Sequence, residues 1–141
     1  FSVGSIYGIW PGDKLVGRTG REQVASAVAL YGPRTVLCIA LPKTNNNNVN
    51  DNVVFEITLV NNRTLWQLSR QNITIKPDGK VFAPGNLRAT TDNQKYNNLV
   101  QHWISHRYQL RYTGGMVPDI YHIFAKGKGV FANVSSATAK A

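Results

Sequence analysis

The sequence predicts an α/β fold built in layers from strands and helices that alternate along the chain. Three observations lead to this prediction. The chain has 141 residues, of which 43% are apolar, which is enough to fill the core of one domain of ordinary size. Short runs with strand character recur, and segments with helical periodicity stand between them. The sequence contains no internal repeat.

The chain is expected to open with a strand and a helix. Residues 2–10 mix small or polar residues with apolar ones, which is typical of a mostly buried strand, and Pro11-Gly12-Asp13 ends the run. Thr19 and Glu22 then have the spacing of a capping box. Apolar residues follow at helical spacing, so we expect a helix that ends at Gly32-Pro33 and carries Val24, Val28 and Tyr31 on one face.

The middle of the chain is expected to form strands. Residues 35–41 are apolar without alternation, which is typical of a central strand covered on both faces. Residues 43–52 contain six asparagines and are expected to form a mobile loop or an insertion. Alternating apolar residues over 53–59, the turn residues Asn61-Asn62 and the apolar run 65–68 together predict a hairpin.

Two further helices and short strands are expected after this hairpin. A strand at 73–75 should lead through the turn Pro77-Asp78-Gly79 to a strand at 81–82, followed by a tight turn at Pro84-Gly85-Asn86. A helix from Gly114 to Phe124 should end at Lys126-Gly127-Lys128-Gly129, before a last strand at 130–133. The other helix should be capped by Thr91 and Gln94, with one face made of Tyr96, Leu99, Val100, Trp103 and Ile104.

Composition narrows the classes of partner. A net charge of +9 could indicate nucleic acid, a membrane surface or an anionic metabolite. The basic residues are spread along the chain without a polybasic run, which disfavours nucleic acid, and the apolar run around Cys38 is far too short to cross a bilayer. Cys38, the only cysteine, excludes an internal disulfide, is expected to be buried and inert, and favours a reducing compartment. The chain begins without Met inside an expected strand, so we interpret it as a fragment or a trimmed product.

Residues 111–120 join an expected strand end to a helix that opens on two glycines, and such a junction can hold an anion. Backbone amides at a helix start have no partner within the helix and carry the positive end of its dipole. Arg111 adds a planar fork that matches phosphate oxygens, and Tyr112 adds a phenol on the opposite side of an extended chain. We therefore expect a phosphate site made by Arg111, Tyr112 and the amides of Gly114, Gly115 and Met116. An ordinary turn with a solvated Arg111 stays open at this point.

The same residues, 111–119, resemble the sugar-bisphosphatase family, which comprises the fructose-1,6- and sedoheptulose-1,7-bisphosphatases. Four more blocks resemble this family in its order and spacing, namely 1–13, 30–35, 82–90 and 129–135. Within the family, Trp10-Pro11-Gly12, residues 84–88 and Val117-Pro118-Asp119 are more similar to the sedoheptulose branch than to the fructose branch.

The resemblance implies a layered sugar-phosphatase-type fold, with mixed sheets between helix layers, that is incomplete in this chain. It implies that residues 1–141 are the substrate-binding segment of a phosphoric monoester hydrolase of carbohydrate metabolism, placed in the Calvin cycle. The expected reaction removes the 1-phosphate of sedoheptulose 1,7-bisphosphate with metal-activated water. The alternatives are a fructose-1,6-bisphosphatase and a non-catalytic module that binds phosphorylated sugars. An inositol-phosphate phosphatase is disfavoured by residues 111–119.

The resemblance also implies Mg²⁺ as cofactor, with its ligands outside this segment, since the seven carboxylates here are dispersed in sequence. The implied partners are a phosphorylated sugar and further copies of the chain in a homo-oligomer, with no nucleic acid and no membrane. The implied location is the plastid stroma or the cytoplasm.

Residue roles follow from matched positions. Tyr112 resembles the tyrosine that holds the distal phosphate of the sugar, and Arg111 the arginine that reaches it from a neighbouring subunit. Met116 resembles a methionine whose backbone lies beside the sugar. Asn86 falls near a phosphate-binding asparagine, with a register that could shift by one, and Arg88 is either a second phosphate contact or a solvated residue. No catalytic residue and no metal ligand is expected in this chain.

Three further residues carry expectations. Asn133 falls where the fructose branch has another phosphate-binding tyrosine, so that contact is in doubt here. His102 and His106 lie one helical turn apart, but Trp103-Ile104-Ser105 between them supplies no acidic base. We therefore expect solvated histidines and no zinc site.

Overall fold

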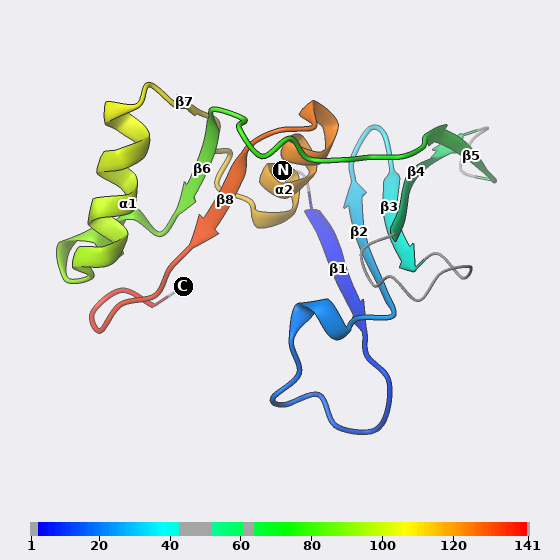
Figure 1. Ribbon diagram of the computed structural model, residues 1–141. Helices are drawn as coiled ribbons and strands as arrows, with labels where there is room; N and C mark the ends of the chain where they lie inside the picture. Colours follow the sequence, from blue (N-terminus) through cyan, green and yellow to red (C-terminus); the bar gives the residue numbers. More distant parts are fainter. Residues whose placement is uncertain (1–2, 43–51, 61–63, 141) are drawn as a thin grey trace. The chain divides into compact units, whose positions relative to one another are not determined.

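A computed structural model describes residues 3–42, 52–60 and 64–140, and it divides the chain into two compact units, 1–74 and 75–141 (Figure 1). The Asn-rich loop expected at 43–52 lies almost entirely outside the described residues. Mixed α/β architecture with antiparallel and parallel sheets is confirmed. That residues 1–141 act as one substrate-binding segment stays a prediction.

The first unit is a five-stranded antiparallel sheet in which each strand pairs with the next one in the chain. The expected opening strand, the strand after Gly32-Pro33 and the hairpin are confirmed, but the expectation that the opening strand is mostly buried is wrong, since most of its residues are exposed. The strands are β1 (Val3–Ile9), β2 (Ala25–Tyr31), β3 (Val36–Pro42), β4 (Asn52–Val60) and β5 (Leu65–Arg70).

The helix expected between Thr19 and Tyr31 is wrong. The capping box exists, with the amide of Thr19 donating to Glu22 Oε2 at 2.6 Å, but it closes only the single 3₁₀ turn η1 (Gly20–Glu22). The following residues form β2, in which Val28 lies opposite Ile6 of β1 and Cys38 of β3. Pairing on both edges satisfies the backbone of β2, and this outweighs the helix propensity of its alanines.

The central place of β3 is confirmed, but the expectation that both of its faces are covered is wrong. Val36 and Cys38 are buried on one face. The other face is only partly buried, and Leu41 is 41% exposed. There the sheet is hollowed by an open apolar depression of about 460 Å³, whose lining includes Tyr7, Ala27, Tyr31, Ile39 and Trp66.

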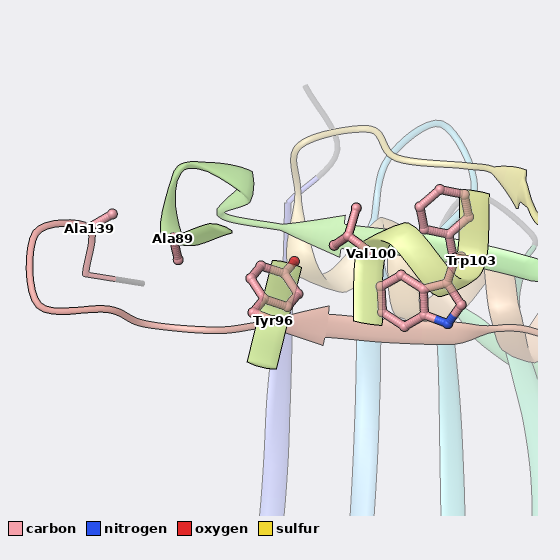
Figure 2. Close-up of a cluster of buried hydrophobic side chains, with 6 residues drawn as sticks. Ala89, Tyr96, Val100, Trp103 and Ala139 are labelled. Atoms are coloured by element: carbon pink, nitrogen blue, oxygen red, sulfur yellow. The ribbon is translucent and has the colours of Figure 1, made fainter. Parts of the chain in front are cut away.

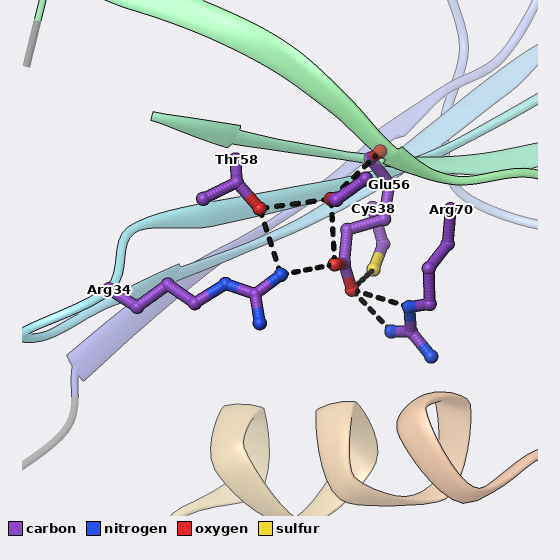
Figure 3. Close-up of polar contacts among 6 residues, drawn as sticks. Arg34, Cys38, Glu56, Thr58 and Arg70 are labelled. Carbon is purple, nitrogen blue, oxygen red and sulfur yellow. Dashed lines mark hydrogen bonds and ion pairs between the residues drawn. The ribbon is translucent and has the colours of Figure 1, made fainter. Parts of the chain in front are cut away.

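A buried carboxylate joins β3, β4 and β5 on the opposite face of this sheet. Glu56 of β4 is completely buried, and it accepts hydrogen bonds from Arg34 Nη2 and Ser69 Oγ, each at 2.8 Å, and from the guanidinium of Arg70 (Figure 3). The thiol of Cys38 lies 3.8 Å from the same carboxylate. Among the described residues of β4, Glu56 is thus buried although it is charged.

The strand expected at 73–75 is wrong. Residues 73–75 have no strand pairing, and only an isolated parallel bridge joins Lys76 to Lys128. The turn at Pro77-Asp78 is confirmed. Ile73 donates its amide to Val54 O at 3.0 Å, so the chain touches β4 without adding a strand to it.

The second unit holds a parallel sheet of three strands with β6 (Val81–Gly85) in the centre, β7 (Gln109–Leu110) on one side and β8 (Val130–Asn133) on the other (Figure 1). The 3₁₀ helix η2 (Leu87–Thr91) and the helix α1 (Gln94–Ser105) connect β6 to β7, and α2 (Met116–Lys126) connects β7 to β8. All five residues of β6 are buried.

The two helices cover opposite faces of this sheet. Buried residues of α1, namely Tyr96, Val100 and Trp103, form a core with Phe82 of β6 (Figure 2), and the rings of Phe82 and Trp103 lie 5.2 Å apart. Successive residues of a strand point to opposite faces. Accordingly Ile123 of α2 lies against Gly129, beside Val81.

The ends of the helices agree only partly with the sequence predictions. Thr91 does not cap α1, because it ends η2, and Asn93 takes that role by accepting the amide of Tyr96 at 3.1 Å. Leu99 and Ile104 are 41% and 56% exposed, so they do not belong to the buried face. The opening of α2 after Gly115 and its end at Gly127, with φ of 63°, are confirmed.

The tight turn expected at Pro84-Gly85-Asn86 is wrong in part, since Pro84 and Gly85 belong to β6 and only Asn86 leaves the strand, with φ of 48°. Among the residues described, neither helix has the length and hydropathy that a membrane span requires.

Replacing Glu56 with Gln should lower the free energy of unfolding by about 3 kcal/mol, because it removes the carboxylate that neutralises two arginines in a buried setting. Glu22→Gln is the matched control, since Glu22 and Arg18 form an exposed ion pair whose loss should leave the urea midpoint almost unchanged. Urea denaturation of the complete protein measures both. A loss below about 1 kcal/mol for Glu56→Gln would contradict the structural role.

Cys38 should be unreactive in the native protein. Burial, and then the negative charge of Glu56, raise the pKa of its thiol to about 11, so almost no thiolate exists at pH 8 and the fraction rises only as the pH approaches that value. Iodoacetamide at pH 8 should leave the Cys38 peptide unmodified in native protein and modify it in denaturant, as read by mass spectrometry. Rapid labelling of the native protein would contradict this.

Candidate functional site

The carboxyl ends of three parallel strands meet along one edge of the second unit. Arg111 follows β7 directly, Asn86 follows β6, and Asn133 is the last residue of β8. The amide of Arg111 donates to Phe82 O at 2.9 Å, so Arg111 is fixed to β6 at a point three residues before the end of that strand. Open parallel sheets bind ligands outside the carboxyl ends of their strands, and loops that lead into α1 and α2 start here. This edge is therefore the candidate site.

Arg111 presents an uncompensated positive charge at this edge. Its side chain is exposed, and Nη1 donates to Leu110 O at 2.9 Å. Among the described residues it forms no ion pair with a carboxylate. Most of its guanidinium donors are therefore free to form two parallel hydrogen bonds to an anion.

Tyr112 follows Arg111 just beyond β7. Burial raises the pKa of the Tyr96 phenol, and the Tyr112 phenol raises it further. The phenol of Tyr96 donates to Gly85 O, at the last residue of β6, at 2.6 Å. Tyr112 itself is 46% exposed, and so its hydroxyl can reach a ligand.

The turn before α2 exposes a small set of backbone donors. Gly114 has φ of 90°, a conformation that favours glycine, and a Cβ on Gly115 would come within 2.8 Å of the ring of Pro118. The amide of Gly115 donates to Thr113 Oγ1 at 3.3 Å, and therefore it is not free as the sequence suggested. The amides of Gly114, Met116 and Val117 have no acceptor in the described part of the chain.

Asp119, in the first turn of α2, accepts a hydrogen bond that closes this turn. The sequence alone did not identify this role. The side chain is 2% exposed, and Oδ1 accepts the amide of Thr113 at 2.7 Å. Oδ2 is buried and has no hydrogen-bond partner among the residues that the structure describes. A carboxylate in the first turn of a helix that follows two glycines is the signal that could have identified it.

The side chain of Asn86 joins the end of β6 to the segment that follows β8. Nδ2 donates to Val134 O and to Ala139 O, both at 2.9 Å, so the amide donors expected for a phosphate are engaged by backbone carbonyls. Arg88 is exposed on η2 at the same edge, with no ion pair among the described side chains. The phosphate roles of both residues stay predictions.

The segment after β8 is fixed by a second polar residue. Asp92 accepts the amide and the hydroxyl of Thr138 at 3.0 and 2.9 Å. Hydrogen bonds from Ser136 and Thr138 lower the pKa of this carboxyl. With Asn86, these contacts attach residues 134–139 to the loop that follows β6.

Asn133 is exposed at the end of β8 and lies against Gly85, where a Cβ would come within 2.7 Å of Asn133 Oδ1. His102 and His106 are exposed with their rings 4.0 Å apart. In the described ranges no three His, Cys, Asp or Glu side chains gather in a way that could hold a metal ion.

Comparison with known proteins agrees with this architecture. The chain is 50% identical to the chloroplastic sedoheptulose-1,7-bisphosphatase of Spinacia oleracea and 48% identical to that of Chlamydomonas reinhardtii, each over all 141 residues. Residues 75–141 match the family described as the C-terminal domain of fructose-1-6-bisphosphatase. Over its whole length the chain is similar to sugar bisphosphatases. It is also 41% identical over 134 residues to a class 1 fructose-1,6-bisphosphatase of Geobacter sulfurreducens.

Solved structures of this family have the same fold. A putative sedoheptulose-1,7 bisphosphatase from Toxoplasma gondii superposes with a TM-score of 0.83 at 40% identity, over all of this chain and 46% of its own. The apo fructose-1,6-bisphosphatase of Leishmania major superposes with a TM-score of 0.68 at 25% identity, over 99% of this chain and 48% of its own. The chain spans 34% of the length of the plant and algal sugar bisphosphatases.

Different substitutions of Asn86 should destabilise the protein to different extents, depending on how each new side chain interacts with the carbonyls of Val134 and Ala139. Asn86→Gly keeps the left-handed backbone and loses two hydrogen bonds, a cost of about 2 kcal/mol. Asn86→Asp turns a carboxylate toward the same carbonyls and should cost about 3 kcal/mol or more. Thermal unfolding measures which of the two variants is less stable. The opposite order of stability is expected if the side-chain amide of Asn86 serves only a ligand.

Proposed function

We propose that the protein carrying this chain is a sugar bisphosphatase that hydrolyses the 1-phosphate of sedoheptulose 1,7-bisphosphate. The carrying observation is the edge formed by Arg111, Tyr112 and the free amides of Gly114, Met116 and Val117, which suits a dianionic phosphate. Identity of 50% to a sedoheptulose-1,7-bisphosphatase over the whole chain supports the substrate and the reaction.

This segment binds the phosphate that does not react. The guanidinium of Arg111 takes two phosphate oxygens, the phenol of Tyr112 donates to one, and the helix amides take what remains. Met116 brings its backbone to the sugar, and Arg88 adds charge at the same edge. Asn86 acts mainly by fixing residues 134–139. Binding energy from the distal phosphate aligns the reacting end and so lowers the barrier there.

Magnesium dependence is part of the proposal, with ligands outside this chain, because the described residues do not offer a metal site. Activity with and without EDTA tests it.

The plastid stroma is the proposed location, since the plant relatives are chloroplastic, with the cytoplasm as the alternative. A homo-oligomer is proposed as the working state, and light scattering tests it.

Two alternatives are separated by the same assay. Release of inorganic phosphate from sedoheptulose 1,7-bisphosphate, compared with fructose 1,6-bisphosphate, gives the preferred sugar through kcat/KM. A complete protein that binds either sugar but releases no phosphate in the presence of magnesium would be a non-catalytic binding module, and the proposed reaction would be wrong.

Arg111→Ala in the complete protein should raise KM about 10- to 100-fold, since it removes charge-assisted hydrogen bonds to the distal phosphate, and should change kcat less. Lys80→Ala is the matched control, because Lys80 precedes β6 and lies at the opposite edge of the same sheet. Steady-state kinetics measure both. An unchanged KM for Arg111→Ala would remove Arg111 from the site.

A further inference from the structure

Two carboxylates are buried among the described residues, and they differ in their surroundings. Glu56 is neutralised by arginines, whereas Asp119 forms no ion pair with any described cation. The carboxylate of Asp119 accepts one amide, that of Thr113, and its second oxygen has no partner among the described residues. A buried carboxylate held by a single amide, in the first turn of a helix, needs a reason to be there.

Three hydrogen bonds give this turn its shape. Thr113 donates its amide to Asp119 Oδ1 at 2.7 Å, Gly115 donates to Thr113 Oγ1 at 3.3 Å, and Asp119 donates its own amide to Gly115 O at 3.1 Å. Pro118 has no amide hydrogen. These contacts therefore consume every other donor and leave the amides of Gly114, Met116 and Val117 for a ligand.

The same contacts fix the residues just before the turn. Thr113 directly follows Arg111 and Tyr112, and the amide of Arg111 is bound to β6 at Phe82 O. The segment is thus held at both ends, by the sheet at Arg111 and by Asp119 at Thr113. Gly114, with no atom near its missing Cβ, would otherwise let the turn sample many conformations.

We propose that Asp119 is a positioning residue for the distal phosphate, and this inference rests on the proposed function. Through Oδ1 it sets which amides face the ligand and where Arg111 and Tyr112 stand relative to them. The contact is made by an acceptor atom and does not need the charge. An asparagine that keeps the acceptor should therefore replace Asp119 in this role.

Steady-state kinetics of the complete protein with sedoheptulose 1,7-bisphosphate test the proposal. Asp119→Ala should raise KM about tenfold, the equivalent of one lost hydrogen bond to a charged group, and should change kcat less than about twofold. Asp119→Asn should restore KM to within about twofold of the parent. Competition by sedoheptulose 7-phosphate, which carries only the distal phosphate, should weaken by the same factor in Asp119→Ala.

Asp78→Ala is the matched control, since Asp78 is an exposed carboxylate in the turn before β6, and it should behave as the parent. An Asp119→Asn enzyme whose KM rises as far as that of Asp119→Ala, with an unchanged melting temperature, would overturn the proposal. An Asp119→Ala enzyme with parental KM would do the same. If Asp119→Ala does not fold, Asp119→Asn decides by itself, because it keeps an acceptor for the Thr113 amide: a KM raised about tenfold with an unchanged melting temperature would overturn the proposal.

Failure of this inference and failure of the proposed function give different results. If Arg111→Ala leaves KM unchanged, the phosphate is bound elsewhere and the proposed function of this edge is wrong. If Arg111→Ala raises KM and Asp119→Ala does not, the edge binds phosphate and only the positioning role of Asp119 is wrong.

Discussion

Parallel pairing of β6 with β7 and β8 is the constraint on which the candidate site depends. All residues of β6 are buried, and the backbone of this strand is satisfied only when both neighbours are in place. Pairing then turns three carboxyl ends in the same direction and brings the ends of β6 and β8 level, although 47 residues of numbering separate Asn86 from Asn133, whereas β7 ends opposite Phe82. Helices α1 and α2 cover opposite faces, so their first turns also open at this edge. The position of Arg111, Tyr112 and the free amides follows from that pairing.

The sequence predicted elements well where local chemistry and tertiary contacts agree. Glycines before Met116 and after Lys126 allow only a narrow choice of backbone, and α2 begins and ends as expected. It predicted poorly where pairing decides: the residues of β2 suit a helix, yet neighbouring strands on both sides hold them extended. Burial of Glu56 was also beyond local patterns, since it depends on Arg34, 22 positions earlier, and Arg70, 14 positions later.

For the candidate site, exposed residues whose side chains are free to bind a ligand could be predicted from the sequence. Residues that position other parts of the site could not. Arg111 and Tyr112 stand next to the two glycines in sequence, and the structure keeps both exposed at the sheet edge. Asp119 was counted only as one of seven dispersed carboxylates, because its role requires the chain to return on Thr113. Asn86 was expected to donate to a ligand, yet both donors meet carbonyls 48 and 53 positions later. Such distances in sequence leave no periodic signal.

Gly85 of β6 and Asn133 of β8 are in tight contact, so the side chains that each position accepts depend on the other position. Any larger residue at 85 would need the carboxamide at 133 to be displaced first, since the new carbon would come within 2.7 Å of its oxygen. Homologues that carry a bulky side chain at one position should therefore carry a compact one at the other. The two positions share one small volume, and this backbone leaves room there for only one large side chain.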